Sequence, residues 1–250
     1  MSLDFTTVSV AVALLFAAFV KGTSGMGFPL IATPMVALLL DIRTAITILI
    51  IPNIVMDVAQ VFRGGFPAAV MRRFGWFFVT TVAGVFLGTR ALVALPLWTL
   101  NFCLGLMVLF FVTSSWLKFD FAISPALEKK LALPAGLAGG FLNGLTNAAG
   151  PAVAIYLYSL RLSKHEFIKS IATIFMVTKL SQLAAVSTWN LFNVRTMSLS
   201  LAVTGFILLG FYAGLKTQDR INQRTFNRVL LVLLFAIGST LVVRALSQRG

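Results

Sequence analysis

Residues 21–29 read Lys21-Gly22-Thr23-Ser24-Gly25-Met26-Gly27-Phe28-Pro29, and this glycine-rich stretch decides the fold. The apolar run Val8–Val20 precedes it, and a short apolar segment, residues 28–40, follows it. Glycine allows a tight turn, and proline suits the first turn of a helix. Residues 28–40 are too short to cross about 30 Å of hydrocarbon. The stretch, which we call the first tip, therefore predicts a helical hairpin (5–21 and 28–40) that turns back within a bilayer.

The other half of the chain contains a second stretch of the same kind. It reads Asn143-Gly144-Leu145-Thr146-Asn147-Ala148-Ala149-Gly150-Pro151, and we call it the second tip. It separates a predicted helix at 131–147 from a short one at 150–161, so it predicts a second hairpin. Irregular backbone at membrane depth is tolerated only where it is buried in protein or lines a wet cavity.

The two halves of the chain repeat each other. A shift of 122 residues superimposes glycines, a proline and a glutamine as well as apolar residues, and after a four-residue insertion the match resumes. We therefore predict a first membrane repeat at 1–117, a linker at 118–130 and a second repeat at 131–250. The matching pairs are Gly22/Gly144, Pro29/Pro151, Ala32/Ala154, Leu38/Leu160, Ile46/Ile168, Val55/Val177, Gln60/Gln182, Gly84/Gly210, Gly88/Gly214, Thr99/Thr225 and Asn101/Asn227.

Composition places the chain in a membrane. Of its 250 residues, 59% are hydrophobic and only 11% are charged, which is too little polar surface for a soluble domain of this length. At about 20 residues for each crossing, there is room for eight to ten segments and little else. We expect an all-α integral membrane protein with six helices besides the two hairpins. They are predicted at 42–62, 74–93, 97–117, 165–189, 196–215 and 225–246.

The basic residues predict the orientation of the chain. Each half holds five segments, so the second half must enter the membrane inverted, a recurring plan of secondary transporters. Loops 63–73, 118–130, 161–169 and 216–228 carry thirteen lysines and arginines, whereas the opposite face carries five. Cytoplasmic loops are the basic ones, so we expect a bacterial cytoplasmic membrane with both termini outside and the linker in the cytoplasm. The net charge of +13 follows from this pattern, and it does not indicate a nucleic-acid partner.

The two tips have the composition of an anion site. Short helices that begin near Pro29 and Pro151 would direct free N–H groups and positive dipole ends at the tips. The alternative is that the glycines only pack helices and the hydroxyls bond back to their own helix. We predict a site between the tips, to which the candidate residues are Lys21, Gly22, Thr23, Ser24, Gly25, Asn143, Gly144, Thr146 and Asn147.

Three charged residues lie deep in the apolar segments. Asp57 and Lys179 occupy equivalent positions in the two repeats, and such residues are costly and usually face the bundle interior. They could form a structural ion pair, or Lys179 could attract an anion while Asp57 titrates to couple a proton. Lys21 could neutralise the substrate or extend to an interface.

Polar side chains line the same two long helices. Asn53, Asp57 and Gln60 are spaced by four and three residues, so they share one face, as do Lys179 and Gln182. These stripes could line a substrate pathway, or they could be hydrogen bonds between helices.

The chain has no enzyme signature. It contains no Gly-x-x-x-x-Gly-Lys-Ser/Thr loop for a nucleotide, its only histidine is His165 in a basic loop, and its acids form no pair in the membrane. We therefore expect neither an enzyme nor a metal or other cofactor.

Four stretches together resemble one family. The first tip with its flanks, the recurrence near the second tip, a glycine pair before the fifth segment and a motif in the last segment are similar to motifs of the TauE/SafE (sulfite exporter, TSUP) permeases. Ser24 and Met26 stand where the family commonly has glycines, and the second tip has Asn147-Ala148-Ala149. The stretches are Phe19–Leu30, Gly140–Pro151, Gly84–Arg90 and Phe226–Leu231.

The resemblance implies an exporter of small sulfur-containing or related organic anions, such as sulfite or sulfonates, across a bacterial cytoplasmic membrane. We expect a secondary transporter in which the repeats rock to expose a site near the midplane to each side in turn. The alternative is a passive anion channel of the same architecture. The expected partners are a small anion and the lipid bilayer, and assembly as a homo-oligomer remains open.

Overall fold

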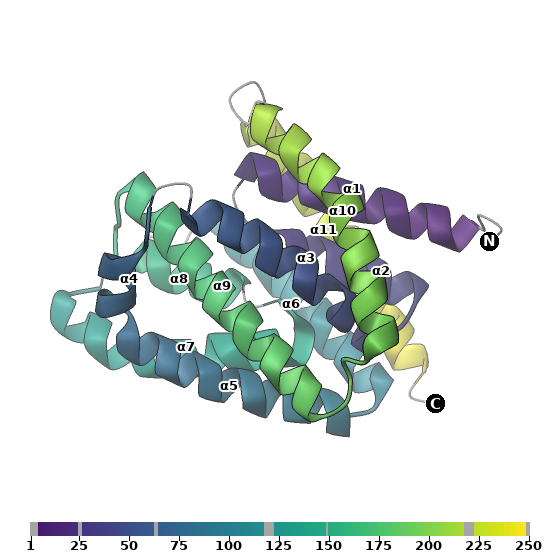
Figure 1. Ribbon diagram of the computed structural model, residues 1–250, viewed down its shortest axis with the longest axis horizontal. Helices are drawn as coiled ribbons and strands as arrows, with labels where there is room; N and C mark the ends of the chain where they lie inside the picture. The colour runs from purple at the N-terminus through teal and green to yellow at the C-terminus, as the bar shows by residue number, and fades with distance from the viewer. Residues whose placement is uncertain are drawn as a thin grey trace.

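The computed structural model describes residues 5–24, 27–62, 65–117, 123–148, 150–217 and 223–248, and these residues form helices joined by short connections (Figure 1). Long helices lie side by side, and the predicted all-helical class is confirmed. The helices are α1 (Phe5–Ser24), α2 (Phe28–Leu39), α3 (Ile42–Phe62), α4 (Ala68–Arg73), α5 (Gly75–Ala94), α6 (Leu97–Leu117), α7 (Pro125–Thr146), α8 (Gly150–Ser159), α9 (Lys164–Thr188), α10 (Val194–Thr217) and α11 (Gln223–Ser247).

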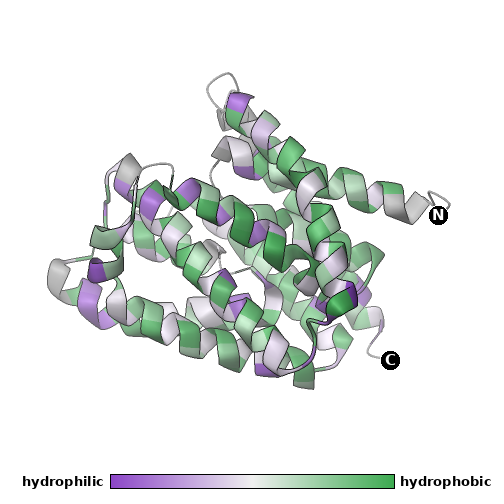
Figure 2. Cartoon of the chain, in the orientation of Figure 1, coloured by the Kyte–Doolittle hydropathy of each residue, from purple (hydrophilic) through white to green (hydrophobic). Residues whose placement is uncertain are grey.

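Six of the described helices are long and apolar enough to cross a membrane: α3, α5, α6, α9, α10 and α11. They are the six that the sequence predicts as full crossings, and the remaining predicted segments correspond to α1, α2, α7 and α8. Figure 2 shows that apolar residues cover most of the helical surface, and side chains such as Leu209 are 67% exposed. Exposed apolar area of this extent suits contact with lipid chains and not with water.

The packing of helices recurs between the two halves of the chain. Helix α1 packs against α10, and α7 packs against α5, while α6 pairs with α11 and α3 with α9. The glycine pairs make these approaches close: Gly84 and Gly88 touch the backbone of α7, and Gly210 and Gly214 touch the backbone of α1. Helix packing, the default role of such small-residue pairs, accounts for all four. The recurrence agrees with a sequence repeat, and the inverted orientation of its halves stays a prediction.

Replacement of Gly88 by alanine is expected to destabilise the protein by about 1–3 kcal/mol, because overpacking forces backbones apart. A Cβ atom at Gly88 would overlap the carbonyl oxygen of Phe141 on α7, which is backbone and cannot turn aside. Thermal unfolding in detergent measures the effect. Gly205→Ala is the matched control, because a Cβ atom there meets nothing within 4 Å. Equal melting temperatures for the two variants would contradict this account of the α5–α7 contact.

The start of α7 and the presence of α4 differ from the sequence prediction by more than a few residues. Helix α7 begins at Pro125 and not at 131, because Ser124 caps it by accepting a hydrogen bond from the backbone N–H of Leu127 and proline occupies its first turn. Helix α4 was not predicted, since six residues carry too little periodicity to stand out.

Arg73 of α4 donates to both carboxylate oxygens of Glu128 on α7, at 2.8 and 3.0 Å, and this contact raises the pKa of Arg73.

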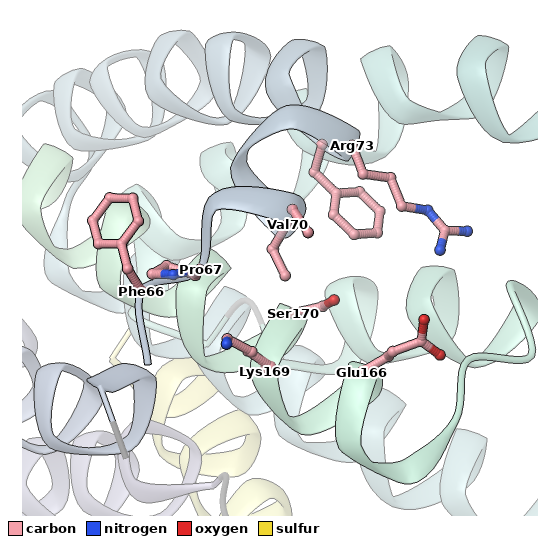
Figure 3. A pocket seen from close by; sticks show the side chains of 9 residues that line it. Phe66, Pro67, Val70, Arg73, Glu166, Lys169 and Ser170 are labelled. Atoms are coloured by element: carbon pink, nitrogen blue, oxygen red, sulfur yellow. The ribbon is translucent and has the colours of Figure 1, made fainter. Parts of the chain in front are cut away.

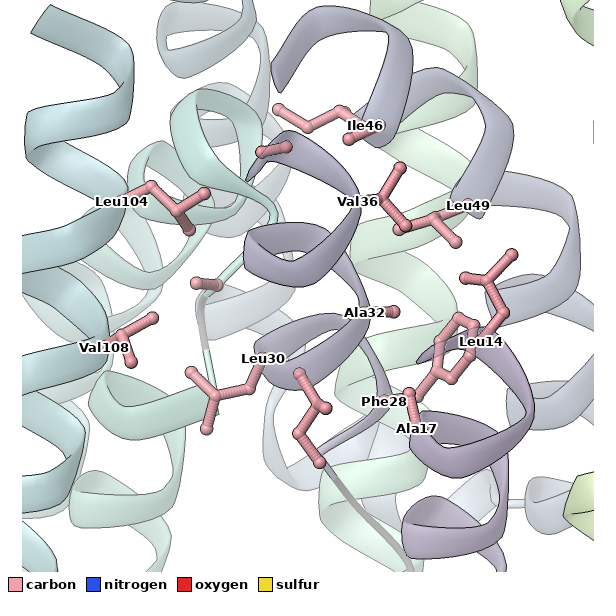
Figure 4. Close-up of a cluster of buried hydrophobic side chains, with 14 of the residues drawn as sticks. Leu14, Ala17, Phe28, Leu30, Ala32, Val36, Ile46, Leu49, Leu104 and Val108 are labelled. Carbon is pink, nitrogen blue, oxygen red and sulfur yellow. The ribbon is translucent and has the colours of Figure 1, made fainter. Parts of the chain in front are cut away.

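The short helix α2 is enclosed by protein. Phe28 lies against Leu14 and Ala17 of α1, while on its other side α2 faces α6 (Figure 4). Eight of its twelve residues are buried. A half-length helix in a bilayer requires such an enclosure, because its free ends would otherwise meet hydrocarbon. The enclosure places the start of α2, at Phe28, in the interior of the molecule.

Candidate functional site

At the first tip the chain changes direction between α1 and α2. Gly27 has a φ of 99°, a conformation that side chains disfavour, and its carbonyl accepts the first hydrogen bond of α2 from Ile31 at 3.1 Å. Pro29 lies in the first turn, as predicted. Gly25 and the side chain of Ser24, both predicted to bind substrate, lie outside the described residues.

Four predicted binding residues instead contact their own helix or a neighbouring one. A Cβ atom at Gly22 would overlap the backbone of α10, and one at Gly144 would overlap the backbone of α5. Thr23 donates to the carbonyl oxygen of Val20 at 2.9 Å, and Thr146 donates to that of Leu142 at 2.8 Å. These contacts are the ones that the packing alternative describes, and neither threonine hydroxyl is bonded to the charged groups below.

Lys21 and Asp57 form a buried ion pair. The Lys21 ammonium donates to Asp57 Oδ1, and each side chain is 1% exposed. Of the two alternatives for Lys21, extension to an interface is wrong, because its side chain is enclosed. The alternative of a direct Asp57–Lys179 bridge is also wrong, because in the described chain the acid pairs with the other lysine.

Lys179 is held by neutral amides. Its ammonium donates to Oδ1 of Asn143 at 2.7 Å, to Oε1 of Gln182 at 2.8 Å and to Oδ1 of Asn147. The amides of Asn143 and Gln182 also bond each other, because Asn143 Nδ2 donates to Gln182 Oε1 at 3.0 Å. Lys179 is 1% exposed and these amides are equally buried. We call these four residues the lysine cage; its positive charge meets no acid within hydrogen-bonding distance in the described structure.

Asn147 joins the lysine cage to the other half of the chain. It ends α7 in the left-handed conformation, with a φ of 62°, which asparagine tolerates better than most residues. Its Nδ2 donates to Thr33 Oγ1 on α2 at 2.8 Å, so the amide oxygen faces Lys179. Sequence reasoning missed Thr33; the only signal was a hydroxyl at the centre of an otherwise apolar segment, and Thr33 is fully buried.

The two charged clusters occupy equivalent positions. Under the 122-residue shift, Lys21 corresponds to Asn143 and Asp57 to Lys179, and both pairs are bonded across 36 residues. Under this shift, the lysine of the first pair lies on α1 and the lysine of the second pair lies on α9. The first cluster pairs a lysine with an acid, whereas the second contains a lysine and neutral amides.

Asn53 Oδ1 and Asp57 Oδ2, both on α3, are buried and have no hydrogen-bond partner in the described structure. The amide nitrogen of Asn53 donates to the carbonyl oxygen of Leu49 at 3.0 Å, which fixes the amide. Gln60 lies on the same helix and is partly exposed. A buried acceptor without a partner costs free energy, so these atoms mark a place where a proton or a donor can be accommodated.

A separate pocket of about 160 Å³ lies between α4 and α9. Figure 3 shows Glu166, Lys169 and Ser170 of α9 on one side, opposite Val70 and Arg73 of α4. None of the predicted binding residues lines it, so it is not the site that the tips predicted. Among the described residues, no three His, Cys, Asp or Glu side chains gather as metal ligands.

Comparison with known proteins gives one result. Neither a curated protein nor a solved structure matches the chain. One family model, described as "Sulfite exporter TauE/SafE", matches residues 10–241 and so includes both hairpins, the ion pair and the lysine cage. A match of this extent shows the family, as the motifs indicated. The chain belongs to the TauE/SafE family of sulfite-exporter membrane transport proteins.

Proposed function

We propose that this chain is a secondary transporter that carries small sulfur-containing or related organic anions, such as sulfite or sulfonates, by alternating access. The observation that carries the proposal is the lysine cage. An isolated buried cation is costly, and within the described part of the chain Lys179 has only neutral oxygens as direct partners. A bound anion would supply the missing negative charge.

The surroundings of Lys179 suit a compact oxyanion. An anion that replaces one of the three amide oxygens would gain a charge-assisted hydrogen bond, roughly twice as strong as a neutral one. Helix α8 begins at Gly150, three residues beyond Asn147, so its first N–H groups and its positive dipole end lie at the same tip. One lysine with neutral amides binds an anion without holding it too tightly for release.

Burial favours a carrier over the alternative, a passive channel. Thr146 and Asn147 are fully buried, and Lys179 is 1% exposed. A channel needs a continuous wet path past these groups, whereas a carrier closes over its site and opens it to one side at a time.

Exchange between internal and external anion is expected to distinguish a carrier from a passive channel. In proteoliposomes loaded with unlabelled sulfite, entry of labelled sulfite should be saturable and faster than into empty vesicles, because a loaded carrier returns its site to the outside. Sulfonates and small carboxylates are tested in the same way, with protein-free liposomes as the control. Uptake that is linear in concentration and indifferent to internal anion would favour the channel, and movement of no anion would contradict the proposed function.

The proposal places the protein in a bacterial cytoplasmic membrane, with both termini outside and export as its direction. The support is the count of basic residues in the loops and the family description. Function as a single chain or as a homo-oligomer is compatible with it, since both tips belong to one chain.

A further inference from the structure

The interior of the described structure holds three charges near one another. Asp57 interacts electrostatically with Lys21 and with Lys179, and the helices that carry Asp57 and Lys179, α3 and α9, pack together. With Asp57 ionised and both lysines protonated, the three groups sum to one positive charge. An occupied site that moves through a low-dielectric interior is favoured when it is neutral.

The other charged residues on the elements around Asp57 do not enter this sum. Helices α2 and α6 carry none, and Arg195 and Lys216 lie exposed near the ends of α10. On α3 itself, Arg43 binds backbone carbonyls of Leu92 and Leu95 at the far end of the helix. The remaining charged or titratable residues of α9 are in its first turns: Lys164, His165, Glu166 and Lys169.

Asp57 has a free position for a proton. Its Oδ1 accepts from Lys21, whereas the buried Oδ2 has no partner among the described residues. A proton can therefore add to Oδ2 without displacing the lysine. The O–H bond that forms removes the negative charge of the carboxylate, and the interior then holds two positive charges instead of one.

Building on the proposed function, we propose that Asp57 sets the valence of the transported anion. With Asp57 ionised, one net positive charge at Lys21 and Lys179 is balanced by a monovalent anion, which crosses alone. With the proton on Oδ2, two positive charges are balanced by a divalent anion, and anion and proton cross together. Each anion then moves one negative charge, whatever its own valence.

Methanesulfonate and sulfate test the proposal in the wild-type protein, because they are similar in size and differ in charge. In proteoliposomes that contain a pH indicator, sulfate uptake should carry about one proton per anion and accelerate as the external pH falls. Methanesulfonate uptake should carry no proton. If both anions move with the same proton count, or if sulfate is excluded even with an inward proton gradient, the valence proposal is overturned. If neither anion nor sulfite moves, it is the proposed function that fails.

Two variants sharpen the test through the ratio of sulfate to methanesulfonate uptake. Asp57→Asn removes the acid and leaves Lys21 and Lys179, so the ratio should rise by more than about 100-fold, the lower end of the factor that corresponds to an uncompensated buried charge, and sulfate uptake should lose its proton. The double variant Lys21→Met/Asp57→Asn leaves only Lys179, so the ratio should fall below that of the wild type. Unchanged ratios in both variants would contradict the proposal. If Asp57→Asn does not fold, the proton count of the wild type decides alone.

Discussion

Replacement of Lys179 by methionine is expected to reduce saturable anion uptake by about 100-fold or more, while the protein still inserts and folds. The binding loss follows from the removal of the charge that holds the anion, since a hydrogen bond to a charged group contributes about 1.5–3 kcal/mol and the long-range attraction adds to it. Folding survives because a cost and a gain in stability offset each other. The amide oxygens of Asn143, Asn147 and Gln182 lose a donor, which destabilises the fold. The removal of an uncompensated buried charge stabilises it.

Initial rates of labelled sulfite uptake measure this effect, and gel filtration and thermal unfolding in detergent monitor the fold. Lys216→Met is the matched control, because Lys216 is exposed on α10 and lies over the ring of Tyr212. The control variant should transport within about twofold of the wild type, as surface substitutions usually have small effects. A folded Lys179→Met protein with full uptake would sink the assignment of the anion to the lysine cage.

Replacement of Lys21 by methionine is expected to destabilise the protein by about 3–5 kcal/mol, because it leaves Asp57 as an unpaired buried charge. The ion pair itself is not expected to contribute much net stability, since the cost of burying two charges offsets their attraction. The double variant Lys21→Met/Asp57→Asn should therefore recover most of the loss. Thermal unfolding of the wild type, both single variants and the double variant gives the coupling energy.

Additivity of the two single effects would contradict a direct pair. Such a result would mean that each side chain acts through separate neighbours, although both are 1% exposed and in contact. Asn53→Leu is a useful further control, since it lies one turn from Asp57 on α3 and its amide bonds only the carbonyl of Leu49 in its own helix.

The helices could be predicted from the sequence because each is a continuous apolar run that ends at a strong local signal. Gly27 and Pro29 separate α1 from α2, and Asn147 ends α7 before α8. The predicted boundaries are within a few residues of the observed ones for most helices. There are two exceptions. Helix α4 is a short amphipathic turn. The start of α7 is set by a serine cap, which lies in a loop whose composition is that of a polar linker.

The contacts of the site could be predicted only in part. Asp57, Lys179, Asn143 and Gln182 stood out because polar groups in apolar helices need partners, and the structure brings the last three together. Which of two lysines meets the single acid depends on helix packing, which a spacing along one helix does not contain. The contact between Asn147 and Thr33 is less predictable still, because it joins residues 114 positions apart through one hydroxyl.

The lysine lies on α1 in one half (Lys21) and on α9 in the other (Lys179). This difference bears on whether one half could take the place of the other. A dimer of two first halves would contain two neutral pairs, and its interior would have no net charge to offer. A dimer of two second halves would contain two uncompensated lysines and no acid. Under this correspondence, only one half of each kind gives two lysines beside one carboxylate, so two copies of the same half would not reproduce the interior.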